Sequence, residues 1–354
     1  ETTHILIDEE YVKNRFQDVF ETLGIKDTVV NTTCLYNDRL YVGTDDGLMI
    51  LDDDEGEISN DLTAALSGIR IRSILSDSKG NIWISTFSDK GLIRYDGNNI
   101  KMFNVENGMP STRMRAAMEM SDGRTMVAFT GGVVIIKGDE IDEMYTDKDG
   151  ITNTEILTAA EMSNGDLVLG SDGGGIYIVH KGKVRHIGVE EGLSSEVVMR
   201  VKKDIADELL WIVSSNSIGY LDSDYNVNTI KNFPYSNNFD LYENDNDEMW
   251  ILSSNGIYVT PVEELLDNRS IDAVFYSRDN GLPCVATANS YSDIGENGLL
   301  YMAGVSGVVK VDIDKDFESV TNLKMSVPFV QADDKFIYPD ENGNYTIASD
   351  VKRI

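Results

Sequence analysis

A repeat of about 42 residues limits the fold of this chain more than any other feature. Seven copies align on one apolar or aromatic key position, with spacings of 42, 43, 42, 43, 39 and 51 residues. The key positions are Tyr41, Trp83, Met126, Val168, Trp211, Trp250 and Tyr301. All seven copies carry a glycine six to eight residues later; in the Trp211 copy it is Gly219, and Ser217 stands six residues after the key position. Short apolar runs bounded by Gly, Asn and Asp indicate β-strands joined by tight turns.

A second marker, a glycine turn followed by an apolar residue, precedes most copies. It occurs at 106–111, 148–153, 190–195 and 279–284, and in a weaker form at 22–27. Such a turn suits the link from the outer strand of one sheet to the inner strand of the next. Four strands in about 42 residues predict an all-β, seven-bladed β-propeller with four antiparallel strands per blade. We expect the key aromatic residues to pack between blades.

We place the propeller at residues 1–315. Its N-terminal segment, residues 1–25, could latch the last blade. Tyr11, Val12 and Phe16 fit a helical face, yet residues 15–25 occupy the place of an outer strand, so helix and strand both remain open. Residues 316–354 change character and predict a linker and a strand pair around 340–343.

The two markers together resemble the two-component regulator propeller family, over roughly residues 22–315. The nearest matches are "ILSDSKGNIWIST" with "KGLIRYDG", and "YNDRLYVGTDDGLMIL". Met126, Val168 and Ser217 depart from the family pattern. The resemblance implies an extracytoplasmic sensor domain, periplasmic or at the cell surface, of a bacterial histidine kinase or diguanylate cyclase. It also implies that residues 316–354 are a linker and the truncated start of an immunoglobulin-like β domain, followed by a membrane helix and a signalling module beyond this sequence. A homodimer of the full receptor stays open.

Composition and charge exclude several function classes. The formal net charge is −31, which argues against nucleic acid or an anionic membrane surface as a partner. The three histidines are too scattered for a metal site or a catalytic triad, and the acidic runs at 51–57 and 244–247 lack the spacing of a calcium loop. We therefore expect no cofactor, no metal and no enzyme activity in this fragment. The two cysteines, Cys34 and Cys284, are expected to be buried free thiols.

Arginines gather where the first strands of several repeats begin. In the register of the family these strands line the central channel, so we predict a ligand site at the channel mouth. The candidate residues are Arg70, Arg72, Arg113, Arg115, Arg200, Asn153, Glu155, Tyr235, Asn237, Asn289 and Tyr291. Alternation should turn Ile71 and Met114 away from these arginines.

Arginine forks suit a carboxylate or sulfate, and amides with aromatic faces suit a sugar. The predicted ligand is a small molecule or an oligosaccharide, and an acidic oligosaccharide is one candidate. In the alternative interpretation the arginines only neutralise neighbouring acids. Two other functions stay open: a polysaccharide lyase or hydrolase on the same fold, and a propeller that serves as a protein-binding scaffold.

Overall fold

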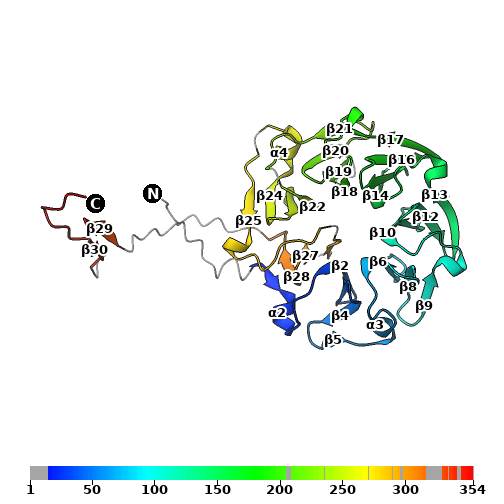
Figure 1. Cartoon of the computed structure of the whole chain (residues 1–354), viewed down its shortest axis with the longest axis horizontal. Helices are drawn as coiled ribbons and strands as arrows, with labels where there is room; N and C mark the ends of the chain where they lie inside the picture. Colours follow the sequence, from blue (N-terminus) through cyan, green and yellow to red (C-terminus); the bar gives the residue numbers. More distant parts are fainter. Residues whose placement is uncertain are drawn as a thin grey trace. The chain divides into compact units, whose positions relative to one another are not determined.

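The computed structural model describes residues 15–204, 209–234, 236–269, 271–288, 290–295, 298–315, 329–333, 335–340 and 344–353. The chain divides into two compact units, Glu1–Lys315 and Asp316–Ile354. In the first unit the described residues form seven four-stranded antiparallel sheets, arranged as blades around a central axis (Figure 1). The predicted all-β, seven-bladed propeller is confirmed.

Blades 1 to 3 run from the innermost to the outermost strand in chain order. Blade 1 consists of β2 (Val30–Tyr36), β3 (Arg39–Thr44), β4 (Leu48–Asp52) and β5 (Gly56–Ile58). Blade 2 consists of β6 (Ile71–Ser76), β7 (Ile82–Thr86), β8 (Leu92–Tyr95) and β9 (Ile100–Phe103). Blade 3 consists of β10 (Met114–Glu119), β11 (Thr125–Phe129), β12 (Gly132–Lys137) and β13 (Glu140–Tyr145).

Blades 4 to 6 repeat this arrangement. Blade 4 consists of β14 (Ile156–Glu161), β15 (Leu167–Ser171), β16 (Ile176–His180) and β17 (Lys183–Ile187). Blade 5 consists of β18 (Val198–Lys203), β19 (Leu210–Ser214), β20 (Ser217–Leu221) and β21 (Val227–Thr229). Blade 6 consists of β22 (Asn238–Glu243), β23 (Glu248–Ser253), β24 (Ile257–Pro261) and β25 (Val274–Tyr276).

Blade 7 is built from both ends of the propeller sequence. Its order is β1 (Gln17–Asp18), β28 (Val308–Asp312), β27 (Leu299–Ala303) and β26 (Asp293–Ile294), so the N-terminal strand is outermost. Gln17 pairs with Lys310 and Asp18 with Val309. The predicted latch is therefore confirmed for these two residues.

A short helix, α2 (Val19–Leu23), follows the latch strand directly. The Asp18 carboxylate caps it by accepting from the amides of Phe20 and Glu21 at 2.9 and 3.0 Å. Residues 15–25 thus contain a strand and a helix in succession, which explains why both patterns were visible. Tyr11 and Val12 lie outside the described residues.

The links between blades contain short helical turns. Two more α-helices are α3 (Asp61–Ala65) and α4 (Val262–Asp267), and the 3₁₀ turns are η1 (Val105–Asn107), η2 (Asp147–Asp149), η3 (Val189–Glu191) and η4 (Arg278–Asn280). Each 3₁₀ turn is followed by the predicted marker glycine at positive φ, as at Gly108 with φ 104°. None of the helices in the described part of the chain has the length and apolarity that a membrane span requires.

The key residues all lie on second strands, and the three tryptophans are buried as predicted. Trp83 of blade 2 packs with Met114 and Phe129 of blade 3, and Trp211 of blade 5 packs with Met249 of blade 6. These side chains join each sheet to the next, which gives the ring its core between blades.

The glycine after the key residue is required by a close approach of two chain segments. Gly91 has φ 67°, and a Cβ atom there would collide with the carbonyl oxygen of Phe103 at the end of the fourth strand. In blade 5, which has Ser217 at the equivalent position, Gly219 instead lies against the carbonyl of Asn228. Blade 5 therefore keeps a close approach between its third and fourth strands, with the glycine two residues later in the sequence.

The second unit contains one described hairpin, β29 (Val330–Ala332) and β30 (Lys335–Ile337). This hairpin precedes the strand pair that we expected around 340–343. Asp333 follows the first strand with φ 51°, a conformation that Asp tolerates in tight turns. Residues 341–343 lie outside the described residues.

Candidate functional site

The inner strands β2, β6, β10, β14, β18 and β22 surround the central channel (Figure 1). We call the face where these strands begin the entry face, and the face where they end the exit face. The predicted site residues that precede or lie on these strands come from five of the six. In blades 1 to 6 a register shift near the start of the inner strand, as between Ile71 and Ser73, moves one residue out of the ladder.

Three predicted arginines gather around one aromatic ring at the entry face, and the backbone of a fourth pairs with that aromatic residue. The guanidinium carbons of Arg70, Arg72 and Arg115 lie 5.7, 5.5 and 5.1 Å from the centroid of Phe87. Arg113 is the antiparallel backbone neighbour of Phe87, and its side chain is exposed. We call Arg70, Arg72, Arg113, Arg115 and Phe87 the arginine cluster. Ile71 and Met114 point into the core, as alternation predicted.

Two arginines of the cluster form ion pairs with acids of neighbouring blades. Arg70 Nε lies 2.9 Å from Asp45 Oδ1 of blade 1, and Arg115 Nη2 lies 2.8 Å from Glu155 Oε2 at the start of blade 4. Arg113 forms no ion pair with any described residue. The local sum of four arginines and two acids is positive, in a chain whose net charge is −31.

Arg72 is the buried member of the arginine cluster, with 6% of its surface exposed. Burial lowers the pKa of its guanidinium, and the nearby charges of Arg70 and Arg115 lower it further. The group nonetheless remains a cation at any physiological pH, because an arginine starts from a very high pKa. Like charges are thus held close together at this spot, which favours the arrival of an anion.

Phe87 was absent from the sequence prediction. It ends the run Ser85-Thr86-Phe87, directly after the second strand of blade 2. The signal that could have found it is its place in the loop between the second and third strands, because these loops open on the same face as the starts of the inner strands. Stacking on arginine gives this half-buried aromatic residue a role other than core packing.

Arg200 lies inside the ring and away from the mouth where we expected it. Its Nε is 3.2 Å from Asp240 Oδ2, and both side chains are 4% exposed. One of its terminal nitrogens donates to the carbonyl of Ser290, and its guanidinium stacks 3.9 Å from the centroid of Tyr291. A guanidinium with these partners is not open to a ligand at the entry face.

Residues 290–292 cross the channel from blade 7. Tyr291 forms a parallel bridge with Thr32 of blade 1, and its hydroxyl donates to the carbonyl of Leu157 of blade 4. The carbonyl of Ser292 accepts from the Tyr242 hydroxyl of blade 6 at 2.7 Å. The long spacing of 51 residues between Trp250 and Tyr301 includes this excursion. Tyr291, one of the predicted site residues, therefore obstructs the channel and joins distant blades.

The other predicted residues have mainly local partners. The Asn153 amide donates to the carbonyl of Asp172 at 2.9 Å, and its oxygen accepts from the amide of Glu155 at 3.1 Å. Asn237 is exposed just before β22, and its carbonyl accepts from the amide of Ser254. Tyr235 and Asn289 lie outside the described residues.

The channel is hollow toward the exit face on one side. A cavity of about 160 Å³ is lined by Ala117, Ala159, Arg200, Lys202 and Tyr291 among others. A wider hollow of about 570 Å³ opens beyond it, and the two share Met118, Ala159, Val201 and Lys202. Sequence reasoning missed Lys202, because it considered only the starts of the strands.

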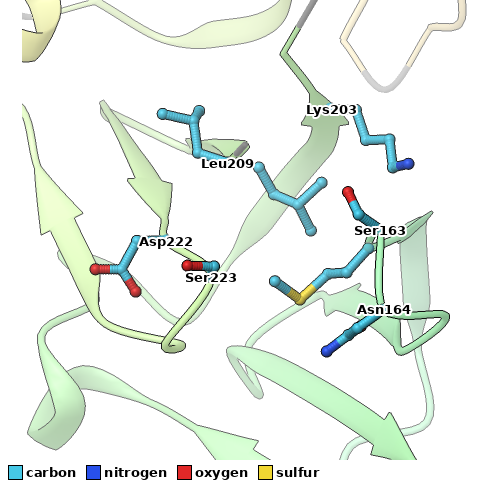
Figure 2. A pocket seen from close by; sticks show the side chains of 8 residues that line it. Ser163, Asn164, Lys203, Leu209, Asp222 and Ser223 are labelled. Carbon is cyan, nitrogen blue, oxygen red and sulfur yellow. The ribbon is translucent and has the colours of Figure 1, made fainter. Parts of the chain in front are cut away.

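A further pocket of about 580 Å³ lies between blades 4 and 5. Figure 2 shows Ser163, Asn164 and Lys203 on one side of this pocket, with Asp222 and Ser223 on the other. The Asp222 carboxylate already accepts the amides of Asp224 and Asn226 within its own turn. Its acidic group thus stabilises the hairpin, and the pocket has no concentration of one charge.

Histidines and cysteines take structural positions in the described chain. His180 and His186 lie on the hairpin of β16 and β17 and are exposed, as predicted, and His4 lies outside the described residues. Cys34 and Cys284 are buried and free, as predicted. Burial raises the pKa of the Cys34 thiol to about 12. Among the described residues, no group of three or more His, Cys, Asp or Glu side chains could hold a metal ion.

Comparison with known proteins supports the family resemblance. The model of the family described as "Two component regulator propeller" matches residues 65–88, which include β6, β7 and Trp83. The resemblance inferred from the repeat is therefore confirmed. A comparison with curated protein sequences found no significant match.

Solved structures share the fold. The extracellular domain of BT3049 from B. thetaiotaomicron, named as a hybrid two-component system, matches with TM-score 0.75 and 16% identity over 95% of this chain and 46% of that one. The extracellular domain of BT4673 from the same organism, named as a one-component system, gives 0.68 and 14% over 96% and 47%. Virginiamycin B lyase from Staphylococcus aureus gives 0.64 and 12% over 84% and 98%. This chain spans less than half the length of the two extracellular domains.

Proposed function

We propose that this propeller is the extracytoplasmic sensor domain of a bacterial signalling receptor, and that it binds an acidic oligosaccharide at the arginine cluster. The match to the regulator-propeller family and the likeness to extracellular domains of BT3049 and BT4673 support the class of protein. In this proposal the domain binds its ligand without catalysis, and the output chemistry belongs to another part of the receptor.

The arginine cluster carries the proposal for the ligand. The guanidinium groups of Arg70, Arg72 and Arg115 lie close enough to the Phe87 ring for a single sugar residue to contact several of them at the entry face. Guanidinium forks bind carboxylates through two parallel hydrogen bonds, and an aromatic face packs on the apolar side of a sugar ring. A uronic acid or a sulfated sugar offers both features in one residue.

Long-range repulsion does not prevent such a ligand from binding. The negative charge of the whole chain is screened over about 8 Å at physiological salt, whereas the arginines act at contact distance. Tyr291 lies across the channel, so a ligand arriving from the entry face stays at the mouth. The ligand would therefore contact loops of blades 2 and 3 above all.

The competing interpretation is that these arginines only neutralise neighbouring acids. The pairs Arg70–Asp45 and Arg115–Glu155 fit that interpretation, and Arg113 distinguishes the two because it has no described acidic partner. Calorimetry with an oligogalacturonate and with an uncharged cello-oligosaccharide of equal length tests the proposal.

We expect the acidic sugar to bind and Arg113→Ala to weaken its binding at least about tenfold, or roughly 1.4 kcal/mol. Arg185→Ala is the matched control, because Arg185 is an exposed arginine on β17 of blade 4, at the periphery of the ring. Equal affinity of the parent and Arg113→Ala for the acidic sugar would reject the arginine cluster as its binding site.

A further inference from the structure

Lys202 lies on the wall of the channel, where two cations share one carboxylate. Its Nζ is 3.0 Å from Asp240 Oδ1, while Arg200 approaches Asp240 Oδ2 at 3.2 Å. The Asp240 carboxylate is 4% exposed, so water does little to screen the two positive charges from each other. Since an arginine does not release its proton, the excess charge is most easily removed by deprotonation of Lys202.

The other charged and titratable groups around Lys202 do not remove this imbalance. Tyr242 of β22 places its ring 3.2 Å from Nζ. Asp293 of β26 is the second nearby acid, but burial raises the pKa of its carboxyl group, and that carboxylate accepts the amide of Leu35 at 2.6 Å. Glu161 and Lys203 line the wider hollow. Burial lowers the pKa of the Lys202 amine to about 8, against the attraction of Asp240.

The cavity gives a small molecule access to this amine. The Lys202 side chain is 30% exposed, and it lines both the cavity of about 160 Å³ and the wider hollow toward the exit face. The small side chains Ala117 and Ala159 of blades 3 and 4 also line the inner cavity. Since a water molecule occupies about 30 Å³, the inner cavity admits roughly five non-hydrogen atoms.

We propose that Lys202 is a reactive amine that forms a reversible imine with a small aldehyde or ketone entering from the exit face. A lysine beside another cation in a secluded site is one of the arrangements that activate an amine for this chemistry. The ammonium group first gives one proton to solvent. The neutral Nζ then attacks the carbonyl carbon, and the carbonyl oxygen leaves as water with the two remaining amine protons.

This inference is independent of the proposed sensor function. It uses the exit side of the channel, whereas the arginine cluster lies on the entry face, with Tyr291 between them. Loss of acidic-sugar binding in Arg113→Ala would leave the amine chemistry unchanged.

The test is reductive trapping on the whole chain. Glycolaldehyde with cyanoborohydride converts the imine into a stable secondary amine, because the added hydride reduces the imine carbon. At pH 7.5 an amine of pKa about 8 is neutral in roughly a quarter of molecules, against about 0.1% for an ordinary lysine. Its lower basicity offsets part of this gain, so we expect Lys202 to be labelled at least about tenfold faster than Lys203, measured by peptide mass spectrometry.

Lys203 is the matched control, because it is the next residue on β18 and its side chain is exposed. Lys202→Arg should remove the fast adduct, and Lys203→Arg should retain it. Ala159→Leu should slow labelling at Lys202 alone, because it fills the cavity. A folded parent protein in which Lys202 is labelled no faster than Lys203, or in which Ala159→Leu leaves the rate unchanged, would overturn the proposal.

Discussion

Arginines occupy two regions of this propeller, and the environments of the two regions differ sharply. At the entry face, Arg70 and Asp45 pair with side chains that are 46% and 57% exposed. At the centre, Arg200 and Asp240 pair with side chains that are both 4% exposed. Exposed pairs contribute little to stability, whereas the loss of one partner from a buried pair is costly. The central arginine is therefore structural, whereas Arg70 and Arg113 at the entry face have exposed side chains.

The central network also compensates for the irregular last blade. Its inner strand β26 has two residues, and the chain before it leaves the blade to cross the channel. Hydrogen bonds then join this segment to three blades: Tyr291 to blade 4, Ser290 to blade 5 and Ser292 to blade 6. A blade with such a short inner strand is thus held by contacts with blades 4, 5 and 6 across and around the channel.

The largest expected effect comes from breaking the central pair. Asp240→Asn keeps the shape of the side chain but leaves Arg200 and Lys202 without their shared carboxylate. We expect a loss of about 3–5 kcal/mol in the free energy of unfolding, the range for an uncompensated buried charge. Urea denaturation measures it. A variant as stable as the parent would show that the centre is more hydrated than its 4% exposure indicates.

The second effect is a dependence of stability on pH that arises from Lys202. The folded protein releases the Lys202 proton at a pKa of about 8, and the unfolded chain keeps it until about 10.4. Between these values the unfolded state binds more protons, so the contribution of Lys202 to stability rises with pH, by at most about 1.4 kcal/mol per pH unit. Below pH 8 the Lys202 amine is protonated in both the folded and the unfolded state, and its partly buried charge lowers the stability of the folded protein.

The measurement compares the parent with Lys202→Met from pH 7 to pH 10. The difference between their free energies of unfolding should change in favour of the parent as the pH rises above about 8. Two curves that stay parallel over this range would show that the Lys202 amine titrates normally.

Much of this fold follows from the repeated sequence, because each strand position recurs in every blade. The key residues lie on second strands, and the glycine after Trp83 is required because Gly91 meets the Phe103 carbonyl. Local rules of this kind act over fewer than twenty residues, so a single sequence displays them. In blade 5, Ser217 stands at the position that the glycine has in other blades, and Gly219 makes the close approach two residues later.

The candidate site was less predictable, because its contacts join residues far apart in the chain. The charge of Arg200 was visible in the sequence, but its burial depends on Asp240 and on Tyr291, 91 positions later. Phe87 has no charge or motif to mark it, and only the packing of blade 2 against blade 3 brings it to Arg115. The excess residues before Tyr301 were visible as a long spacing, yet their path across the channel was not.

The smallest expected effect concerns the exposed pair, and it separates the two interpretations of the arginine cluster. Asp45→Asn removes one negative charge beside Arg70 and should change the free energy of unfolding by less than about 1 kcal/mol, because the pair is exposed. If the cluster only balances charge, that is the whole effect. If it binds an acidic sugar, removing the competing carboxylate frees Arg70, and the affinity for the oligogalacturonate should rise roughly twofold, or about 0.4 kcal/mol. Asp139→Asn is the matched control, because Asp139 pairs with Arg94 at a hairpin turn on the periphery of the ring. Calorimetry that finds weaker binding in Asp45→Asn would instead indicate that Asp45 itself contacts the ligand or positions Arg70 for it.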